Sequence, residues 1–79
     1  MAPPRALQPE FGKVLRGFRL KAGLSQEGLA ALARVDTTYV SLLERGGRQP
    51  TLAVIHALAI ALGKRAYELV KAAEEVDLA

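Results

Sequence analysis

Residues 26–45 contain two short helical patterns separated by a tight turn, and this arrangement constrains the fold more than any other feature. Apolar residues recur at helical spacing on both sides of the turn, with Leu29 before it and Val40 and Leu43 after it. Two such helices must meet at a steep angle with a small residue where they touch, and Ala30 supplies that residue. Periodicity alone leaves open whether the segment is this motif or an αα-hairpin in an unrelated bundle.

The composition favours a single, all-helical domain. The chain has 79 residues, the size of one small domain, and it contains no cysteine, which excludes disulfide bonds and thiolate zinc sites. Alanine and leucine dominate, whereas β-branched residues are few, as is typical of helical proteins. Residues 1–8 are proline-rich and predict a flexible N-terminal arm. We therefore expect residues 9–79 to form one domain.

Five segments carry helical periodicity, and residues that start or end helices flank them. Pro9 suits the first turn of the first helix and Gly23 suits its end. Ser25, Asp36 and Thr51 are each placed to cap the helix that follows. We expect a first helix from about Pro9 to before Gly23, a second that begins at Gln26, and further helices over about residues 36–45, 52–62 and 65–76. Their apolar stripes predict these core residues: Phe11, Val14, Leu15, Phe18, Leu29, Ala30, Leu32, Ala33, Val40, Leu43, Leu52, Ile55, Leu58, Ala59, Leu62, Ala66, Leu69, Val70 and Ala73.

The charge is unevenly distributed along the chain. The net charge is +3, but residues 1–50 carry +4 and residues 51–79 carry −1. This asymmetry favours an anionic partner for the N-terminal part, and ordinary surface charge for solubility is the alternative. The first residues, Met-Ala-Pro-Pro-Arg, lack the apolar run of a secretory signal, and the longest uncharged stretch, Gln49 to Gly63, is too short to span a bilayer. We therefore expect a cytoplasmic protein with no membrane association.

Several runs of residues together resemble one family of regulators. The run Gly23-Leu24-Ser25-Gln26-Glu27, the run from Tyr39 to Gly46, and the segments at Arg48, 50–52 and 59–63 are similar to the lambda-type repressor and Cro (Xre) family. The resemblance covers about residues 11–70. It implies an all-α, compact five-helix lambda-repressor-like DNA-binding domain with a helix-turn-helix at helices 2 and 3. The run Asp36-x-Thr38-Tyr39-Val40-Ser41 is also similar to controller proteins of restriction–modification systems, among other small members of the family.

Two positions depart from the family's pattern. Arg34 occupies the turn where the family has glycine, and Gly28 replaces an acidic residue in the second helix. If Arg34 keeps a positive φ, its backbone is strained, and the alternative is a remodelled turn. Neither change removes a group expected to contact DNA, and both are expected to lower stability.

The resemblance implies which residues meet DNA. The recognition helix, residues 36–45, would enter the major groove. We expect base contacts from Thr37, Thr38, Ser41 and Leu42, and phosphate contacts from Gln26, Tyr39, Arg45 and Arg48. The alternatives are solvated first-turn residues for the threonines and Gln26, a packing role for Tyr39, and solvated arginines. The resemblance also implies a structural ion pair between Arg19 and Glu44 that orients the recognition helix.

The helix over residues 52–62 is apolar on nearly all faces, which indicates burial on more than one side. A two-fold homodimer would cover it, with Val54, Ile60, Leu69 and Val70 at the interface. The alternative is that the last helix covers this surface within one subunit.

These observations predict a sequence-specific transcriptional regulator that binds palindromic, double-stranded operator DNA as a homodimer. The alternatives are the DNA-binding antitoxin of a toxin–antitoxin pair and a protein-interaction module that kept only the fold. His56 is the only histidine and has no ligand partners at metal-binding spacing, and no catalytic motif is present. We therefore expect no enzyme activity, no cofactor, no metal and no small-molecule ligand.

Overall fold

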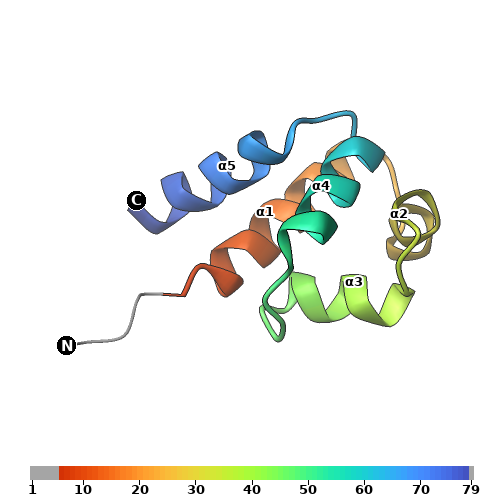
Figure 1. Ribbon diagram of the computed structural model, residues 1–79, viewed down its shortest axis with the longest axis horizontal. Helices are drawn as coiled ribbons and strands as arrows, with labels where there is room; N and C mark the ends of the chain where they lie inside the picture. The colour runs from red at the N-terminus through yellow and green to blue at the C-terminus, as the bar shows by residue number, and fades with distance from the viewer. Residues whose placement is uncertain (1–5, 79) are drawn as a thin grey trace.

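The structure, a computed structural model, describes residues 6–78, which form five helices (Figure 1). These are α1 (Gln8–Lys21), α2 (Gln26–Ala33), α3 (Thr37–Glu44), α4 (Leu52–Ala61) and α5 (Ala66–Leu78). The all-α fold is confirmed, since this range holds no strand, and no helix within it is long and apolar enough to cross a membrane. Of the expected N-terminal arm, residues 1–5 lie outside the described range, and α1 already begins at Gln8.

Two of the three expected helix caps form. The Ser25 hydroxyl accepts a hydrogen bond from the Gly28 amide at 2.9 Å, and the Thr51 hydroxyl accepts one from the Val54 amide at 3.1 Å. Asp36 occupies the N-cap position of α3, but its side chain accepts no capping hydrogen bond from the described residues, so that prediction is wrong in its chemistry. The N-terminus of α3 therefore keeps backbone N–H groups that no side-chain cap satisfies.

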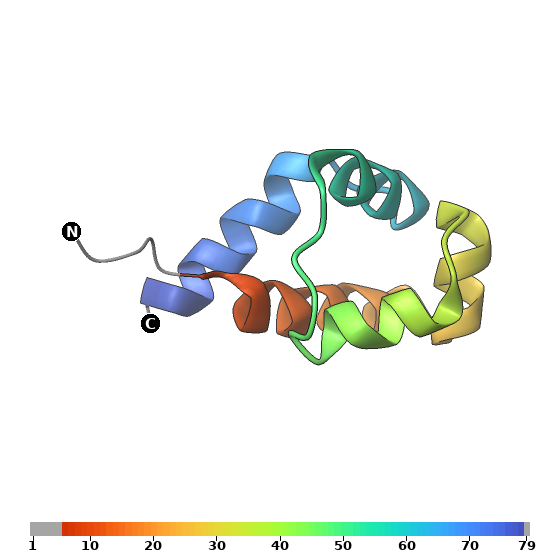
Figure 2. The same ribbon diagram turned by 60° about the horizontal axis from the view of Figure 1, so that its bottom comes forward.

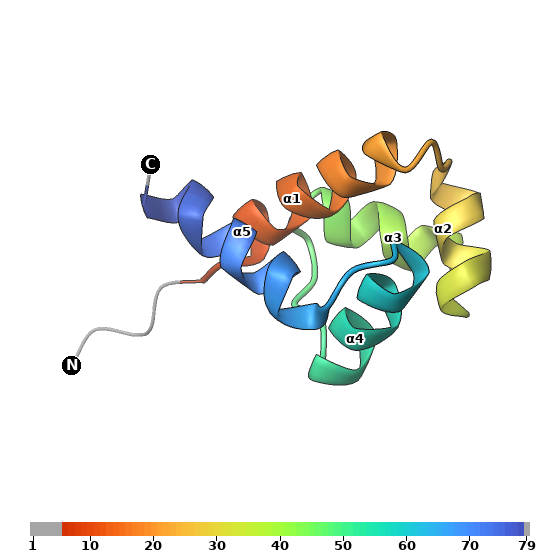
Figure 3. The same ribbon diagram turned by 90° about the horizontal axis from the view of Figure 1, so that it is seen from above.

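α1 is the central helix of the domain, because it packs against both α3 and α5. α3 lies alongside α1 (Figure 2), and α5 runs past α1 in the opposite direction (Figure 3). α2 packs against α3 and α4, and α4 packs against α5. The largest fully buried side chains are Leu15, Leu29, Val40, Leu43, Leu58 and Leu69. Burying each such side chain stabilises the fold by about 1.5–3 kcal/mol, which matters in a chain without disulfides.

Two leucines lie elsewhere than the periodicity predicts, and a third is too deeply buried for the interface expected of it. Leu32 is 60% exposed on α2, and Leu52 is 79% exposed at the first residue of α4, although both were expected in the core. Leu69 is fully buried within a single chain, which agrees with its place in the predicted core stripe and leaves it no exposed surface for the interface that was also predicted for it. For Leu52 the physical reason is that α4 is apolar on nearly all faces, so periodicity cannot decide which face of this helix its own domain covers.

Gly12 allows α1 and α3 to approach closely. A Cβ atom added at Gly12 would lie 2.6 Å from the carbonyl oxygen of Glu44 and closer still to that of Leu43. Favourable contacts of a carbon atom lie at about 3.5–4.0 Å, so only glycine fits without a shift of backbone. Arg19 lies seven residues further along α1 and therefore on the same face. This face of α1 meets the C-terminal end of α3.

Arg34 joins α2 to α3 in the left-handed conformation, with φ 59° and ψ 45°. It is the only non-glycine residue with a positive φ in the described part of the chain. The Arg34 amide donates to the Ala31 carbonyl and the Val35 amide donates to the Ala30 carbonyl, which closes the end of α2. The turn thus keeps the conformation that glycine would adopt, and a side chain there costs about 1–2 kcal/mol.

Replacing Arg34 with glycine is therefore expected to raise the free energy of unfolding. The matched control is Arg34→Ala, which removes the same charge but keeps a Cβ at positive φ. Glycine relieves the backbone strain, but it also has greater conformational entropy in the unfolded chain, which offsets part of this gain. The free energy of unfolding is therefore expected to be about 0.5–1 kcal/mol higher with glycine than with alanine. Urea denaturation followed by circular dichroism measures the difference, and equal stability of the two variants would contradict the assigned strain.

Candidate nucleic-acid interface

α3 lies along an outer edge of the domain, at the bottom of Figure 1 and away from α5. Val40 and Leu43 anchor it in the core. The positions expected to contact bases lie on the helical face away from these anchors, and all of them keep some exposed surface: Thr37, Thr38, Ser41 and Leu42. Thr38 is the most open of the four. The outer face of α3 is therefore free to meet a partner.

The residues expected at phosphates surround this face. Gln26 is the first residue of α2 and is half-buried. Tyr39 is half-buried and packs against the core, which supports the packing role that the sequence left open. Arg45 and Arg48 are exposed at the other end of α3 and in the loop that follows. Basic side chains in such positions suit a polyanion.

Contacts that the sequence analysis missed hold the loop after α3 against α1. Gly46 has φ +75°, and a Cβ added there would lie 3.1 Å from the Cα of Pro9. The Gln8 side-chain amide donates a hydrogen bond to the Gln49 side-chain oxygen at 3.1 Å. Arg48 lies between these two contacts in the sequence, so its backbone is held near the first turn of α1.

The expected ion pair between Arg19 and Glu44 is present and almost fully buried. Arg19 Nε lies 2.6 Å from Glu44 Oε2 and Arg19 Nη2 lies 3.0 Å from Glu44 Oε1, a bidentate geometry. The two side chains are 9% and 4% exposed. Arg19 Nη1 also donates to the Leu24 carbonyl at 2.9 Å, and Gln26 Nε2 donates to Glu44 Oε1 at 3.1 Å. One carboxylate thus connects α1, the start of α2 and the end of α3.

The network determines the ionisation of Glu44. Burial alone would raise the pKa of Glu44, because a charged carboxylate is costly away from water. Hydrogen bonds from Arg19 and Gln26, together with the positive charges of Arg19 and Arg16, outweigh burial and bring the pKa below its usual value. The hydrogen bond to Glu44 likewise raises the pKa of Arg19. Both groups are therefore charged in the folded protein at neutral pH.

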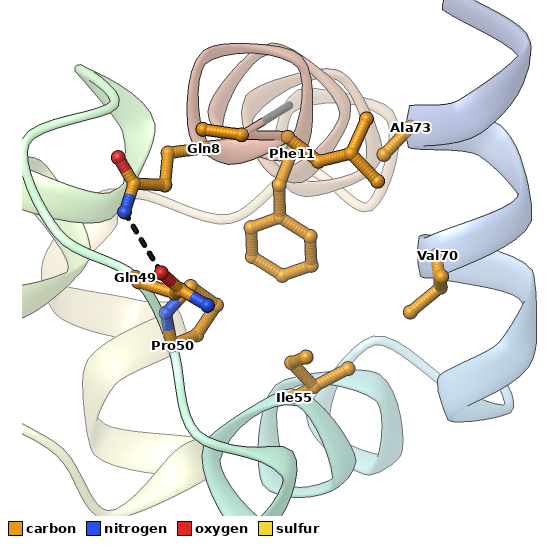
Figure 4. A pocket seen from close by; sticks show the side chains of 9 residues that line it. Gln8, Phe11, Gln49, Pro50, Ile55, Val70 and Ala73 are labelled. Atoms are coloured by element: carbon orange, nitrogen blue, oxygen red, sulfur yellow. Dashed lines mark hydrogen bonds between the residues drawn. The ribbon is translucent and has the colours of Figure 1, made fainter. Parts of the chain in front are cut away.

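An apolar groove of about 490 Å³ lies between α1, α4 and α5 (Figure 4). Phe11, Ile55 and Val70 line it together with Ala6, Leu7, Pro50 and Ala73, and the polar lining is the hydrogen-bonded pair Gln8 and Gln49. No residue of α3 lines the groove, whereas Val70, one of the residues expected at a dimer interface, does.

The expected interface residues differ in exposure. Ile60 is 63% exposed, whereas Val54 and Val70 are half-buried. Leu52 and His56 lie eight and four residues before Ile60, so the three form one exposed stripe on α4. Leu52 was expected in the core, and the one signal for its exposure was the polar residue His56, four positions further along the same face.

Most of the chain is similar to known proteins. A family model described as a helix-turn-helix domain matches residues 10–68, a range that takes in α2, α3 and the loop of Arg48. The restriction–modification controller protein C.AhdI from Aeromonas hydrophila is 45% identical, with a TM-score of 0.77, and the match covers 78% of this chain and 94% of that chain.

Two further relatives agree with this match. The control protein C.BamHI from Bacillus amyloliquefaciens is 40% identical over 60 residues, which are 75% of this chain and 74% of C.BamHI. A hypothetical transcription factor from Neisseria meningitidis serogroup B is 43% identical over 61 residues. That match takes in 77% of this chain but only 58% of the length of the Neisseria protein.

Proposed function

We propose that this chain binds double-stranded operator DNA sequence-specifically as a homodimer. The premise is that the chain belongs to the helix-turn-helix domain family and is a transcriptional regulator. The observation that carries the proposal is the exposed face of α3, whose two ends differ in chemistry. Small hydroxyl side chains lie at its start and basic side chains at its end, and the ion pair of Arg19 and Glu44 fixes its orientation.

The start of α3 would read base edges in the major groove. The hydroxyls of Thr37, Thr38 and Ser41 can donate or accept hydrogen bonds, and the threonine methyls and Leu42 can pack on thymine methyl groups. No long amide or guanidinium side chain stands among these positions. DNA shape would therefore carry a substantial part of the specificity.

Phosphate contacts would position the domain on the duplex. Arg45 and Arg48 would contact the phosphates of one DNA strand at the end of α3, and Gln26 would contact the DNA backbone beside the start of α2. Tyr39 would bring its hydroxyl to a phosphate while its ring supports α3. These contacts are independent of sequence, and they would supply much of the affinity.

A two-fold dimer would cover the exposed stripe of α4. Leu52 and Ile60 are the proposed central contacts, with the half-buried Val54 and Val70 beside them. Such symmetry is the commonest among homo-oligomers, and it would place the two recognition helices about 34 Å apart, one turn of DNA. The operator would then be palindromic.

Selection of bound duplexes from a random library tests the function directly. The wild type is expected to select a palindromic motif, because two identical α3 helices would read two half-sites. The variant with Thr37→Ala and Thr38→Ala is expected to select an altered motif at the central positions of each half-site. If this variant selected an unchanged motif, the threonines would not contact bases. If the wild type enriched no motif, sequence-specific binding would be contradicted.

Sedimentation equilibrium at tens of micromolar tests the dimer. The wild type is expected to sediment as a dimer, and Ile60→Glu as a folded monomer, because burying an unpaired carboxylate at the interface is costly. The matched control is Leu32→Glu, which changes an apolar side chain of similar exposure on α2 and is expected to leave the dimer intact. A monomeric wild type would contradict the dimer.

The similarity to C.AhdI and C.BamHI favours a narrower form of the same function. In this form the chain is a controller-type regulator, whose operator occupancy follows its own concentration through dimerisation. The selected motif would then occur beside restriction–modification genes. A toxin that co-purifies with the chain would instead identify it as an antitoxin.

A further inference from the structure

The Glu44 carboxylate accepts one hydrogen bond besides those of its ion pair with Arg19. Its Oε1 atom accepts hydrogen bonds from Arg19 Nη2 at 3.0 Å and from Gln26 Nε2 at 3.1 Å. The Arg19 bond joins α1 to α3, whereas the Gln26 bond joins α3 to the first residue of α2. Gln26 is half-buried, so the residue meets the carboxylate and still keeps part of its surface open to solvent.

The bond to Glu44 fixes the orientation of the Gln26 amide. An ionised carboxylate only accepts hydrogen bonds, so the amide must turn its nitrogen, not its oxygen, toward Glu44. The nitrogen carries two hydrogens, and one of them is used by Glu44. The second N–H remains as a donor on the same nitrogen, in a direction set by the first bond.

We propose that Glu44 is a positioning residue for DNA binding, because it orients the Gln26 amide so that its second N–H donates to a backbone phosphate. This inference rests on the proposed function, in which Gln26 lies beside the DNA backbone. One amide nitrogen would then bridge two anions, the buried carboxylate and the phosphate. The bidentate contact with Arg19 neutralises the carboxylate, so a phosphate can approach without facing an unbalanced negative charge.

A double-mutant cycle tests the coupling between Gln26 and Glu44. The probe is a fluorescein-labelled 30-base-pair duplex of random sequence, read by anisotropy at low salt, since a phosphate contact needs no operator. Gln26→Met keeps the length of the side chain but removes both donors, and it is expected to weaken binding roughly three- to ten-fold, the value of one hydrogen bond. In the Glu44→Gln background, the same change is expected to weaken binding by less than about two-fold, because a neutral carboxamide both donates and accepts and no longer forces the Gln26 amide to turn its nitrogen toward it.

Arg48→Ala is the matched control for this cycle. Arg48 is an exposed phosphate candidate with no bond to Glu44, so its effect is expected to be the same in both backgrounds. Arg48→Ala should also lower the slope of log affinity against log salt by about one. Circular dichroism establishes the temperature at which every variant is folded before affinities are compared.

Side-chain amide NMR of the wild type gives a second measurement, which holds even if Glu44→Gln does not fold. One Gln26 Nε2 proton is expected to follow the titration of Glu44, and the other is expected to shift when the duplex is added. The side-chain amide of Gln49, which is hydrogen-bonded to Gln8 and not to Glu44, serves as the control for the titration. A wild type that does not bind the duplex overturns the proposed function. Binding with equal Gln26→Met effects in both backgrounds, or with neither amide proton responding, overturns this inference alone.

Discussion

Replacing Gly12 with alanine is expected to lower the free energy of unfolding by about 2–4 kcal/mol, although alanine is the better helix former by about 1 kcal/mol. The added Cβ would lie 2.6 Å from the carbonyl oxygen of Glu44 and closer to that of Leu43. Both atoms belong to the backbone of α3, so no side-chain rotation relieves the clash. α3 must move away from α1, which stretches the ion pair beside it. A domain of this length has roughly 4–12 kcal/mol of stability in total, so the change is severe.

Gly17→Ala is the matched control on the same helix. A Cβ at Gly17 meets no atom within 4 Å among the described residues, so this variant is expected to gain about 1 kcal/mol from helix propensity alone. Urea denaturation followed by circular dichroism gives both values. If the two alanine variants had equal stability, the close approach of α1 and α3 would be wrong. Because α3 is the proposed recognition helix, Gly12→Ala should also weaken DNA binding at temperatures where it is folded.

Local rules explain why the helices could be predicted from the sequence. Ser25 and Thr51 cap the helices that follow them, because each hydroxyl accepts a hydrogen bond from the backbone N–H only three residues later. Such a cap depends on no distant part of the chain. Gly23 and Gly63 end helices at positive φ for an equally local reason. The ion pair of Arg19 and Glu44 was implied by the resemblance to a family, not by spacing, since 25 residues separate the partners.

Features that depend on tertiary contacts could not be predicted in the same way. The space that excludes a Cβ at Gly12 is set by carbonyls more than 30 residues away. The bond between Gln26 and Glu44 needs the crossing angle of α2 and α3, which periodicity does not give. Leu52 lies on the surface and not in the expected core, because a helix that is apolar on nearly all faces offers little pattern to orient it. The base and phosphate contacts stay predictions, because they depend on a partner as well as on the chain.

Breaking the ion pair by Arg19→Met is expected to lower the free energy of unfolding by about 3–5 kcal/mol at pH 7. Both side chains are less than one tenth exposed, so the variant leaves the Glu44 carboxylate buried without its main partner. The double variant with Arg19→Met and Glu44→Met replaces the pair with apolar side chains of similar length. It is expected to recover most of the loss, because the cost comes from the unpaired charge and not from the missing attraction.

The pH dependence separates this explanation from a simple loss of packing. In the wild type the folded pKa of Glu44 lies below its unfolded value of about 4.3, so its contribution is fully present above pH 4.3 and is lost as the pH falls through the folded pKa. In Arg19→Met, burial acts with less opposition and raises the pKa of Glu44, so protonation favours the folded state. Urea denaturation between pH 7 and pH 3 should therefore show the gap between wild type and Arg19→Met closing as the pH falls. A gap that stays constant over this range would mean that Arg19 stabilises the domain by packing, and that the charge of Glu44 does not orient α3.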